Sequence, residues 1–356
     1  MKETRAGWEE NVRQVVPYVP GEQPKEDGVI KLNTNENPYP PSPKVEAALR
    51  GEKVADLRKY PDPTAEMLVD AIAQQCGVTP DMVYPGVGSD DVLSMCFMTF
   101  FQSGKPLLFP DITYSFYDVW AQLYRIPYLA VPLDKHFHIQ KEDYYTENGG
   151  IIFPNPNAPT GIEESQDMVE DIIQHNPDSV VIVDEAYVDF GGTSALPFVK
   201  KYDNLLVVQT FSKSRSMAGM RIGYAIGSPK LIEYLNRVKY SFNSYTMSRT
   251  AIEAGTAAME DKDYFETTRN KIIETREWSK KELARLGFTF PDSKANFLFV
   301  TNPKLDAKKL FEDLKQAKIY VRYFDKPRIN QYLRITIGTQ EEMQALIHFL
   351  ENYSQD

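Results

Sequence analysis

The chain of 356 residues is long enough for two domains, or for one large domain with an accessory lobe. Its 42% hydrophobic and 25% charged residues are typical of a folded globular protein and exclude a disordered chain. With 50 acidic and 40 basic side chains the net charge is −10, which disfavours nucleic acid and anionic membrane surfaces as partners. An anionic ligand would therefore need a local cluster of donors.

The cysteine and histidine content excludes several further classes. Cys76 and Cys96 are the only cysteines, so a disulfide framework and a Cys/His metal motif are both missing. The four histidines show no metal-ligand spacing beyond His136-x-His138, which is more typical of a polar strand edge. The first residues lack an apolar signal stretch, and the longest apolar runs are too short to span a bilayer. We expect a cytoplasmic protein without a metal.

Residues 17–43 are rich in proline, which disfavours both helix and strand interiors. We expect this segment to belong to an extended arm over 1–43 that forms part of the small domain and contacts a partner subunit or lines a cleft. The prolines are Pro17, Pro20, Pro24, Pro38, Pro40, Pro41 and Pro43.

Helical and strand patterns alternate from about residue 64 to 240, within a large domain that we expect over 44–255. Apolar residues recur at helical spacing over 92–101, whereas 150–153, 179–183 and 205–208 are short runs suited to buried strands. This alternation predicts a large α/β domain with a mainly parallel central sheet.

The order of elements changes after residue 255. The patterns predict a charged helix near 264–286, a strand over 296–300, a helix over 305–317, strands over 319–324 and 332–337, and a helix over 340–352. We expect residues 256–356 to form a small α+β domain.

Residues 210–224 place a lysine among hydroxyl groups directly after a predicted buried strand. A lysine in such a position can be desolvated, which favours the neutral amine that attacks a carbonyl to form a Schiff base. Lys213 is therefore a candidate nucleophile, and Thr210, Ser212 and Arg221 are candidate donors to a phosphate. The alternative is a solvated basic loop.

Asp184 ends another predicted strand, and Tyr187 follows three residues later. At the carboxyl edge of a parallel sheet, an Asp can keep a heteroaromatic nitrogen protonated while a Tyr hydroxyl donates to a ring oxygen. That pair describes a site for pyridoxal phosphate. A helix cap or a Mg²⁺ ligand would also explain an Asp at the end of a strand.

Gly88, Ser89 and Asp90 come directly before the predicted helix over 92–101. Glycine lets the backbone approach a phosphate, and the amides and dipole of a first helical turn attract it. Plain helix capping explains the same residues nearly as well.

Two more segments carry candidate contacts to a planar ligand. The amide of Asn157 lies in a rigid, proline-rich turn over 153–161, and Tyr114 could stack on a ring. Turn formation and ordinary packing are the alternatives.

In this order, the motifs resemble the fold-type I pyridoxal-phosphate-dependent aminotransferases, and most of all the histidinol-phosphate aminotransferase family. The resemblance runs from the arm to the C-terminus, and it is also carried by Pro17-Tyr18, KLNTNENP over 31–38, RKYP over 58–61, SKANF over 293–297, Val321-Arg322 and LRITIG over 333–338. It implies an α/β fold with a large cofactor domain and a small domain.

The resemblance also implies a role for each matching residue. Lys213 would form the Schiff base with pyridoxal 5′-phosphate and move a proton between the substrate Cα and the cofactor C4′. Asp184 would pair with the pyridine nitrogen, Tyr187 would hydrogen-bond the phenolic oxygen, and Tyr114 would stack on the ring. The cofactor phosphate would be surrounded by Gly88, Ser89, Asp90, Thr210, Ser212 and Arg221.

The resemblance further implies a homodimer with shared active sites. Tyr60 would reach the cofactor phosphate of the neighbouring subunit. Arg322 and Arg334, with Tyr18 from the partner's arm, would clamp the substrate anion, and Asn35 would line the same pocket.

One position departs from the family pattern. The family usually has Asn directly before Pro-Thr-Gly, where its amide supports the cofactor's phenolic oxygen, but this chain has Ala158 there and Asn157 one position earlier. Either Tyr187 holds that oxygen alone, or Asn157 compensates after a backbone shift.

The leading hypothesis is an enzyme of histidine biosynthesis that moves an amino group between L-histidinol phosphate and 2-oxoglutarate by a ping-pong mechanism. An aromatic amino-acid aminotransferase or a threonine-phosphate decarboxylase would use the same scaffold and Lys213. A non-catalytic regulator or binding module of the same fold is the hypothesis from another class. Loss of Lys213 or Asp184 would favour it, but both are present.

Overall fold

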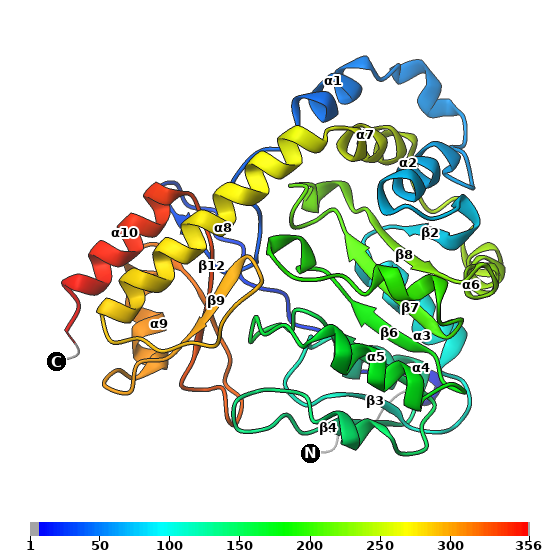
Figure 1. Ribbon diagram of the computed structural model, residues 1–356. Helices are drawn as coiled ribbons and strands as arrows, with labels where there is room; N and C mark the ends of the chain where they lie inside the picture. Colours follow the sequence, from blue (N-terminus) through cyan, green and yellow to red (C-terminus); the bar gives the residue numbers. More distant parts are fainter. Residues whose placement is uncertain (1–6, 355–356) are drawn as a thin grey trace.

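The structure is a computed structural model that describes residues 7–354. Its helices lie in both halves of the chain (Figure 1). They are α1 (Pro43–Gly51), α2 (Glu66–Cys76), α3 (Ser89–Phe100), α4 (Tyr117–Tyr124), α5 (Gln166–His175), α6 (Pro229–Phe242), α7 (Arg249–Glu260), α8 (Lys262–Arg285), α9 (Ala307–Gln316) and α10 (Gln340–Glu351). Short 3₁₀ turns are η1 (Glu9–Asn11), η2 (Val54–Arg58), η3 (Pro80–Met82), η4 (Lys141–Tyr144), η5 (Val188–Phe190), η6 (Leu196–Lys200) and η7 (Ala218–Met220).

The central sheet has seven strands in the order β2-β8-β7-β6-β5-β3-β4. The strands are β2 (Val83–Gly86), β3 (Leu107–Pro110), β4 (Tyr128–Val131), β5 (Gly150–Pro154), β6 (Val181–Asp184), β7 (Leu205–Thr210) and β8 (Gly223–Gly227). Only β8 runs antiparallel to its two neighbours, β2 and β7. The predicted mainly parallel sheet is therefore confirmed.

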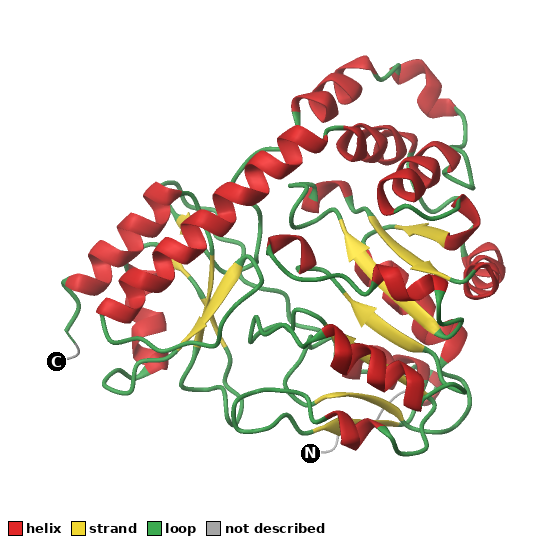
Figure 2. Ribbon diagram, viewed as in Figure 1, coloured by secondary structure: helices red, strands yellow, loops and turns green. Residues whose placement is uncertain are grey.

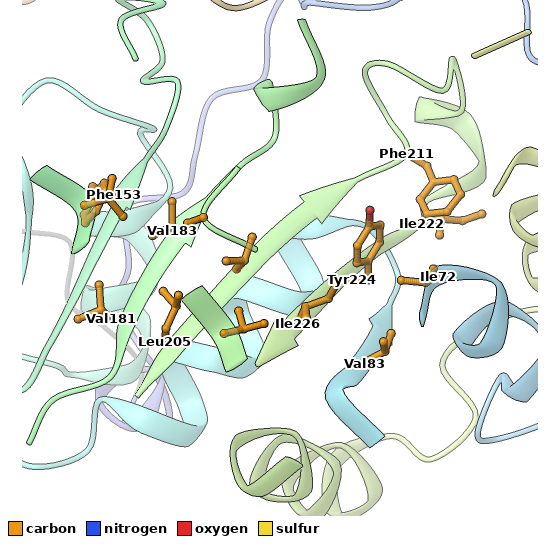
Figure 3. Close-up of a cluster of buried hydrophobic side chains, with 14 of the residues drawn as sticks. Ile72, Val83, Phe153, Val181, Val183, Leu205, Phe211, Ile222, Tyr224 and Ile226 are labelled. Atoms are coloured by element: carbon orange, nitrogen blue, oxygen red, sulfur yellow. The ribbon is translucent and has the colours of Figure 1, made fainter. Parts of the chain in front are cut away.

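The two faces of this sheet are covered by different helices, because alternate side chains of a strand point to opposite faces. Val181, Val183 and Leu205 pack with α2, α5 and α7, as part of the cluster drawn in Figure 3. Ile182 and Leu206 pack on the other face with α3, α4 and α6. This layering, also visible in Figure 2, leaves the carboxyl ends of β5, β6 and β7 at one edge of the sheet.

A second, smaller core lies beyond α8, which leads away from the central sheet (Figure 1). Its antiparallel sheet has the order β11-β12-β9 and is packed by α8, α9 and α10. The strands are β9 (Phe297–Val300), β11 (Arg322–Tyr323) and β12 (Leu333–Thr336). The predicted helices and strands of this small α+β lobe are present within a few residues of their expected bounds.

Two predictions about strands were wrong. The proline-rich arm contains β1 (Ile30–Lys31), which pairs in parallel with β10 (Ile319–Tyr320). The arm can form this strand because its prolines lie outside 25–37, so the backbone N–H of Ile30 is free to donate to Lys318 O at 2.9 Å. The single strand expected over 319–324 is divided, since β10 pairs with β1 and β11 pairs with β12.

The boundaries 1–43, 44–255 and 256–356 stay a prediction. Residues 1–6 and 355–356 of the first and last segments lie outside the described residues. Over 7–354, no helix combines the length and apolar character needed to cross a membrane.

Candidate active site

Two adjoining cavities lie between the carboxyl edge of the central sheet and the small lobe. The inner cavity, of about 170 Å³, includes Asp184 at the end of β6 and Thr210 at the end of β7. The outer cavity, of about 150 Å³, includes Arg322 and Arg334. The two cavities share Thr34, Tyr114, Ala158, Tyr187 and Lys213. Residues from sequence positions 18 to 334 are thus brought together, with Lys213 between them.

Asp184 is a buried carboxyl group on the inner cavity, only 4% exposed. Its Oδ2 accepts a hydrogen bond from the Tyr117 hydroxyl at 2.8 Å, and its Oδ1 accepts from Ala186 N–H at 3.2 Å. Burial raises the pKa of Asp184 to about 6, against the lowering effect of the Tyr117 hydrogen bond. Within residues 7–354 no lysine or arginine forms an ion pair with it. A ligand cation at this place would restore its charge.

The first turn of α3 fits a phosphate group. Gly88 caps this helix with a φ of +88° and no side-chain hydrogen bond, which leaves first-turn N–H groups for a ligand. Ser89 and Asp90 line the inner cavity here. The Asp90 carboxylate itself accepts from the Tyr114 hydroxyl at 2.9 Å, so its backbone, rather than its side chain, suits an anion.

Arg221 completes this cradle with Thr210 and Ser212, which line the same cavity. The Arg221 Nη1 lies 3.5 Å from Ser212 Oγ and its Nη2 lies 3.8 Å from Asp90 Oδ2. A Cβ atom at Gly88 would lie 2.4 Å from Arg221 Nη2, so glycine is required for this close approach. The guanidinium and the helix start therefore converge on one point.

Lys213 lies just after β7 and is the only described lysine that lines either cavity. Its Nζ donates to Thr34 O at 3.3 Å and lies 5.8 Å from the centre of the Tyr187 ring. The ring of Tyr187 packs edge-on against Phe297, with ring centres 5.0 Å apart. The amine can thus reach a ligand in both cavities.

The small lobe provides a basic wall for the outer cavity. Arg322 on β11 and Arg334 on β12 are direct cross-strand partners. Arg334 Nη2 donates to Asn33 O at 2.9 Å, while its buried Nε has no hydrogen-bond partner. Burial lowers the pKa of Arg334, and the nearby Arg322 lowers it further. Two adjacent guanidinium groups without a carboxylate partner in the described chain fit an anionic ligand.

Tyr18 lines the outer cavity of its own chain, and its contribution from the partner's arm stays a prediction. Its ring stacks on Phe116 at 4.2 Å, and Asn33 Nδ2 holds the arm by donating to Glu22 O at 2.8 Å. Tyr60 lines neither cavity. It is 79% exposed and stacks on Tyr245, with ring centres 4.7 Å apart.

Asn157 is directed away from the cavities. Its Nδ2 donates to Ile112 O and to Thr160 Oγ1, both at 3.0 Å, so both amide hydrogens are engaged elsewhere. The neighbouring Ala158 lines both cavities. The suggested compensation by Asn157 for the missing amide therefore has no support in the geometry.

Asn35 lines the outer cavity, with Arg322 and Arg334, and it also contacts Tyr187. Its Nδ2 donates to the Tyr187 hydroxyl at 2.9 Å. Tyr117, Thr34 and Phe324 were missed by the sequence analysis. Tyr117 had a usable signal, because it follows Tyr114 by one helical turn and the two rings pack edge-on.

These features fit a planar heteroaromatic group that carries a phosphate. The buried Asp184 offers an anion to a ring nitrogen, the α3 start with Arg221 offers donors to a phosphate, and Lys213 offers an amine between them. Across the described ranges, no group of three or more His, Cys, Asp or Glu side chains could hold a metal ion.

Comparison with known proteins gives a consistent family. Residues 27–350 match the family model described as aminotransferase class I and II. Histidinol-phosphate aminotransferase 1 of Methylococcus capsulatus is 54% identical over 96% of this chain and 96% of its own length. Histidinol-phosphate aminotransferase of Lactococcus lactis subsp. cremoris is 51% identical, over 97% of each chain.

The fold comparison agrees. The crystal structure of histidinol-phosphate aminotransferase from Sinorhizobium meliloti in complex with pyridoxal-5′-phosphate superposes with a TM-score of 0.80, at 25% identity over 90% of this chain and 89% of that chain. The enzyme of the same name from Clostridium acetobutylicum, at 22% identity over 90% of this chain and 97% of that chain, shares the fold with a TM-score of 0.83. The expected fold type I is thereby confirmed. The chain therefore belongs to the histidinol-phosphate aminotransferase family of class I and II aminotransferases.

Proposed function

We propose that the chain is a pyridoxal-phosphate-dependent enzyme that transfers the amino group of L-histidinol phosphate to 2-oxoglutarate, giving imidazole-acetol phosphate and L-glutamate. The observation that carries this proposal is the position of Lys213 between a buried carboxyl group and a pair of guanidinium groups. The family supports the same reaction, since relatives with this name are about half identical over nearly the whole chain.

Pyridoxal 5′-phosphate, when bound, supplies an electron sink conjugated to the substrate Cα. Asp184 keeps the ring nitrogen protonated, because a cation there relieves the cost of burying its carboxylate. The first-turn amides of α3, with Arg221, hold the phosphate. Tyr187 donates to the phenolic oxygen, and Tyr114 stacks on the ring. These residues hold the cofactor and leave the proton transfer to Lys213.

Lys213 Nζ takes the proton from the substrate Cα and returns it within the same cavity. It is suited to this because no other described lysine lines either cavity. Its hydrogen bond to Thr34 O orients the amine while leaving further protons and, when neutral, its lone pair free.

Arg322 and Arg334 hold the anionic end of each substrate in turn. The planar fork of a guanidinium group binds either a phosphate or a carboxylate in a bidentate manner. The phosphate of the amino donor and the distal carboxylate of 2-oxoglutarate are thus interchangeable at one clamp. This accounts for a ping-pong reaction with two different substrates at one site.

The functional unit of the proposal is a homodimer in which Tyr60 reaches the phosphate of the partner's cofactor. Tyr60 is exposed in the single chain and lines neither of its own cavities. Exposed apolar side chains near it support a surface that a partner covers. They are Val54, Leu57 and Met67, which are close to it in sequence, and Tyr245, whose ring stacks on it. The cytoplasmic location stays a prediction.

A substrate panel tests this proposal. We expect the purified protein with cofactor to transfer the amino group of histidinol phosphate to 2-oxoglutarate, and Lys213→Ala to lose about 10³-fold or more of this activity. Arg285→Met, which removes a surface arginine paired with Glu282 and Glu351, serves as the control and should retain activity.

The other outcomes of the panel correspond to the alternatives. Faster transfer from aromatic amino acids would favour an aromatic aminotransferase, and CO₂ release from threonine phosphate would favour a decarboxylase. A visible spectrum that shows no bound pyridoxal phosphate would contradict all three enzyme hypotheses. Binding without any turnover would favour a non-catalytic binding protein.

A further inference from the structure

Asn35 is held rigidly where the small lobe meets the outer cavity. It is 1% exposed and adopts a left-handed φ of +55°, a conformation that asparagine tolerates better than most residues. Its backbone N–H donates to Thr336 Oγ1 at 3.0 Å, and its backbone carbonyl accepts from Asn296 Nδ2 at 3.1 Å. Neither the backbone nor the side chain of Asn35 is free to reorient.

The same contacts fix which end of the Asn35 amide faces the cavity. The Thr336 hydroxyl donates its proton to Asn35 Oδ1 at 3.1 Å, so the NH₂ end points to Tyr187. The Tyr187 hydroxyl is then the acceptor of this 2.9 Å hydrogen bond. Its own proton is left for another acceptor, and Tyr187 lines the inner cavity.

The residues around Tyr187 offer few other sources of such support. Ala158 lines both cavities with Tyr187, but its methyl group cannot donate a hydrogen bond. The amide hydrogens of Asn157 are used by Ile112 and Thr160. Asn35 is therefore the described side-chain amide that contacts Tyr187.

We propose that Asn35 is a positioning residue for the cofactor in this chain: it directs the Tyr187 hydroxyl proton to the phenolic oxygen of pyridoxal phosphate and replaces the missing amide at position 158. The proposal rests on the proposed function, because it needs the cofactor in the inner cavity. Consecutive hydrogen bonds polarise one another, so a Tyr hydroxyl that accepts from an amide is a stronger donor.

A stronger donor stabilises the anionic phenolic oxygen. That oxygen then attracts less strongly the proton on the nitrogen that joins Lys213 to the cofactor, so this proton leaves at lower pH. The bound chromophore reports this event through its visible absorbance. The charged side chains that share the cavities with Tyr187 are Glu36, Asp90, Asp184, Lys213, Arg221, Arg322 and Arg334, and the variants below change none of them.

The contact also links the two lobes. Asn35 follows β1, and its anchor Thr336 lies on β12, the strand that carries Arg334. Tyr187 belongs to the loop after β6 of the central sheet. The donor strength at the cofactor's oxygen therefore depends on the strand that holds the substrate anion.

The test is a pH titration of the visible spectrum of the cofactor-loaded enzyme. In Asn35→Gly, where glycine accepts the left-handed backbone, we expect the titration midpoint to rise by about half a pH unit or more. Thr336→Val removes the hydroxyl that orients the amide and that also accepts from the Asn35 backbone N–H, and it should raise the midpoint by less. Tyr187→Phe gives the largest rise. Asn157→Ala is the matched control, since it removes a buried amide that does not contact Tyr187, and its midpoint should equal that of the wild type.

The outcomes separate this proposal from the proposed function. Wild-type midpoints in both Asn35→Gly and Thr336→Val, or a shift in Asn157→Ala instead, would overturn the role of Asn35. A wild-type protein without a cofactor absorbance that depends on Lys213 would overturn the proposed function itself. Thr336→Val keeps the branched shape of the side chain and changes no residue that lines either cavity, so it still decides the question should Asn35→Gly fail to fold.

Discussion

The two walls of the cavities bury opposite charges in opposite ways. The wall formed by the central sheet buries the Asp184 carboxyl group, and burial raises its pKa to about 6. The wall formed by the small lobe contains Arg334, and burial lowers its pKa. Neither group forms an ion pair within the described chain.

The difference shows that the protein keeps its opposite charges apart rather than pairing them. A buried carboxylate and a buried guanidinium in contact would neutralise each other and leave nothing for a ligand. Separated by the cavities, they favour a ligand assembly with a cation at one end and an anion at the other. The cost to the empty protein is the desolvation of both groups, and the ligands repay it on binding.

Of the changes to the two walls, removal of the basic wall should have the largest effect on activity. Arg334→Met should lower kcat/KM for both amino donor and acceptor about 100-fold or more, because a charged donor to each substrate anion is lost. The thermal midpoint of the ligand-free variant should not fall, since the substitution removes a buried charge without an ion-pair partner. Steady-state kinetics and thermal melts measure both quantities.

Arg322→Met extends this experiment to the cross-strand neighbour of Arg334. The guanidinium of Arg322 lies 5.5 Å from the centre of the Phe324 ring. We expect a similar loss of activity for this variant. An Arg334→Met enzyme with wild-type KM for both substrates would show that the basic wall does not bind them.

The next effect concerns the acidic wall and the pH dependence of stability. Asp184 has a folded pKa near 6, about two units above its unfolded value, so the folded state binds the proton more tightly. Stability without cofactor should therefore fall as pH rises from about 4 to 6, by roughly 3 kcal/mol from this group. Asp184→Asn should remove this share. Thermal melts across this pH range measure it.

The adjacent residue provides a matched control. Burial raises the pKa of Glu185 to about 7, but its carboxylate is bound by Ser194, Ala195 N–H and Gln209 and lines neither cavity. Its share of the pH dependence has the same sign and extends toward pH 7. Bound pyridoxal phosphate should abolish the contribution of Asp184 to the pH dependence of stability and leave the contribution of Glu185 unchanged. Equal effects of the cofactor on Asp184→Asn and Glu185→Gln proteins would contradict a contact between Asp184 and the ring.

The parts of the fold and site that could be predicted from the sequence are those encoded locally. Buried β-branched runs predicted β5, β6 and β7. Asp184 and Lys213 lie at or just after the ends of two of these strands. They meet at one edge of the sheet because parallel strands end together. Arg322 and Arg334 needed the family resemblance, since nothing in their spacing indicates the antiparallel pairing that makes them neighbours.

The failures all depend on contacts between distant segments. The strand β1 forms because the edge of β10 is available to pair with it. The short segment Ile30–Lys31 has no strand pattern of its own, so the sequence did not predict it. Asn157 was predicted from its position beside a known motif, but its hydrogen-bond partner Ile112 belongs to another loop. The hydrogen bond between Asn35 and Tyr187 joins residues 152 positions apart, which no local pattern encodes.

Lys239 is a buried cation that lies outside both cavities, and it extends the comparison. Lys239 on α6 is 3% exposed, and its Nζ donates to Pro63 O at 2.9 Å and lies 5.2 Å from the Tyr240 ring. Burial lowers its pKa. Like Arg334, Lys239 has no ion-pair partner in the described chain. Its hydrogen bond to Pro63 O instead holds the loop that carries Tyr60.

Lys239→Met should therefore leave substrate KM close to wild type and weaken cofactor binding by only about 2- to 10-fold, as expected for loss of one hydrogen bond that positions Tyr60. The dissociation constant of pyridoxal phosphate measures the effect, with Tyr60→Phe as the reference for loss of the hydroxyl itself. The double variant should bind the cofactor no more weakly than Tyr60→Phe, because both changes act through one hydroxyl. Additive losses would mean that Lys239 acts on the fold generally, and an unchanged constant in Lys239→Met would mean that Tyr60 is positioned without it.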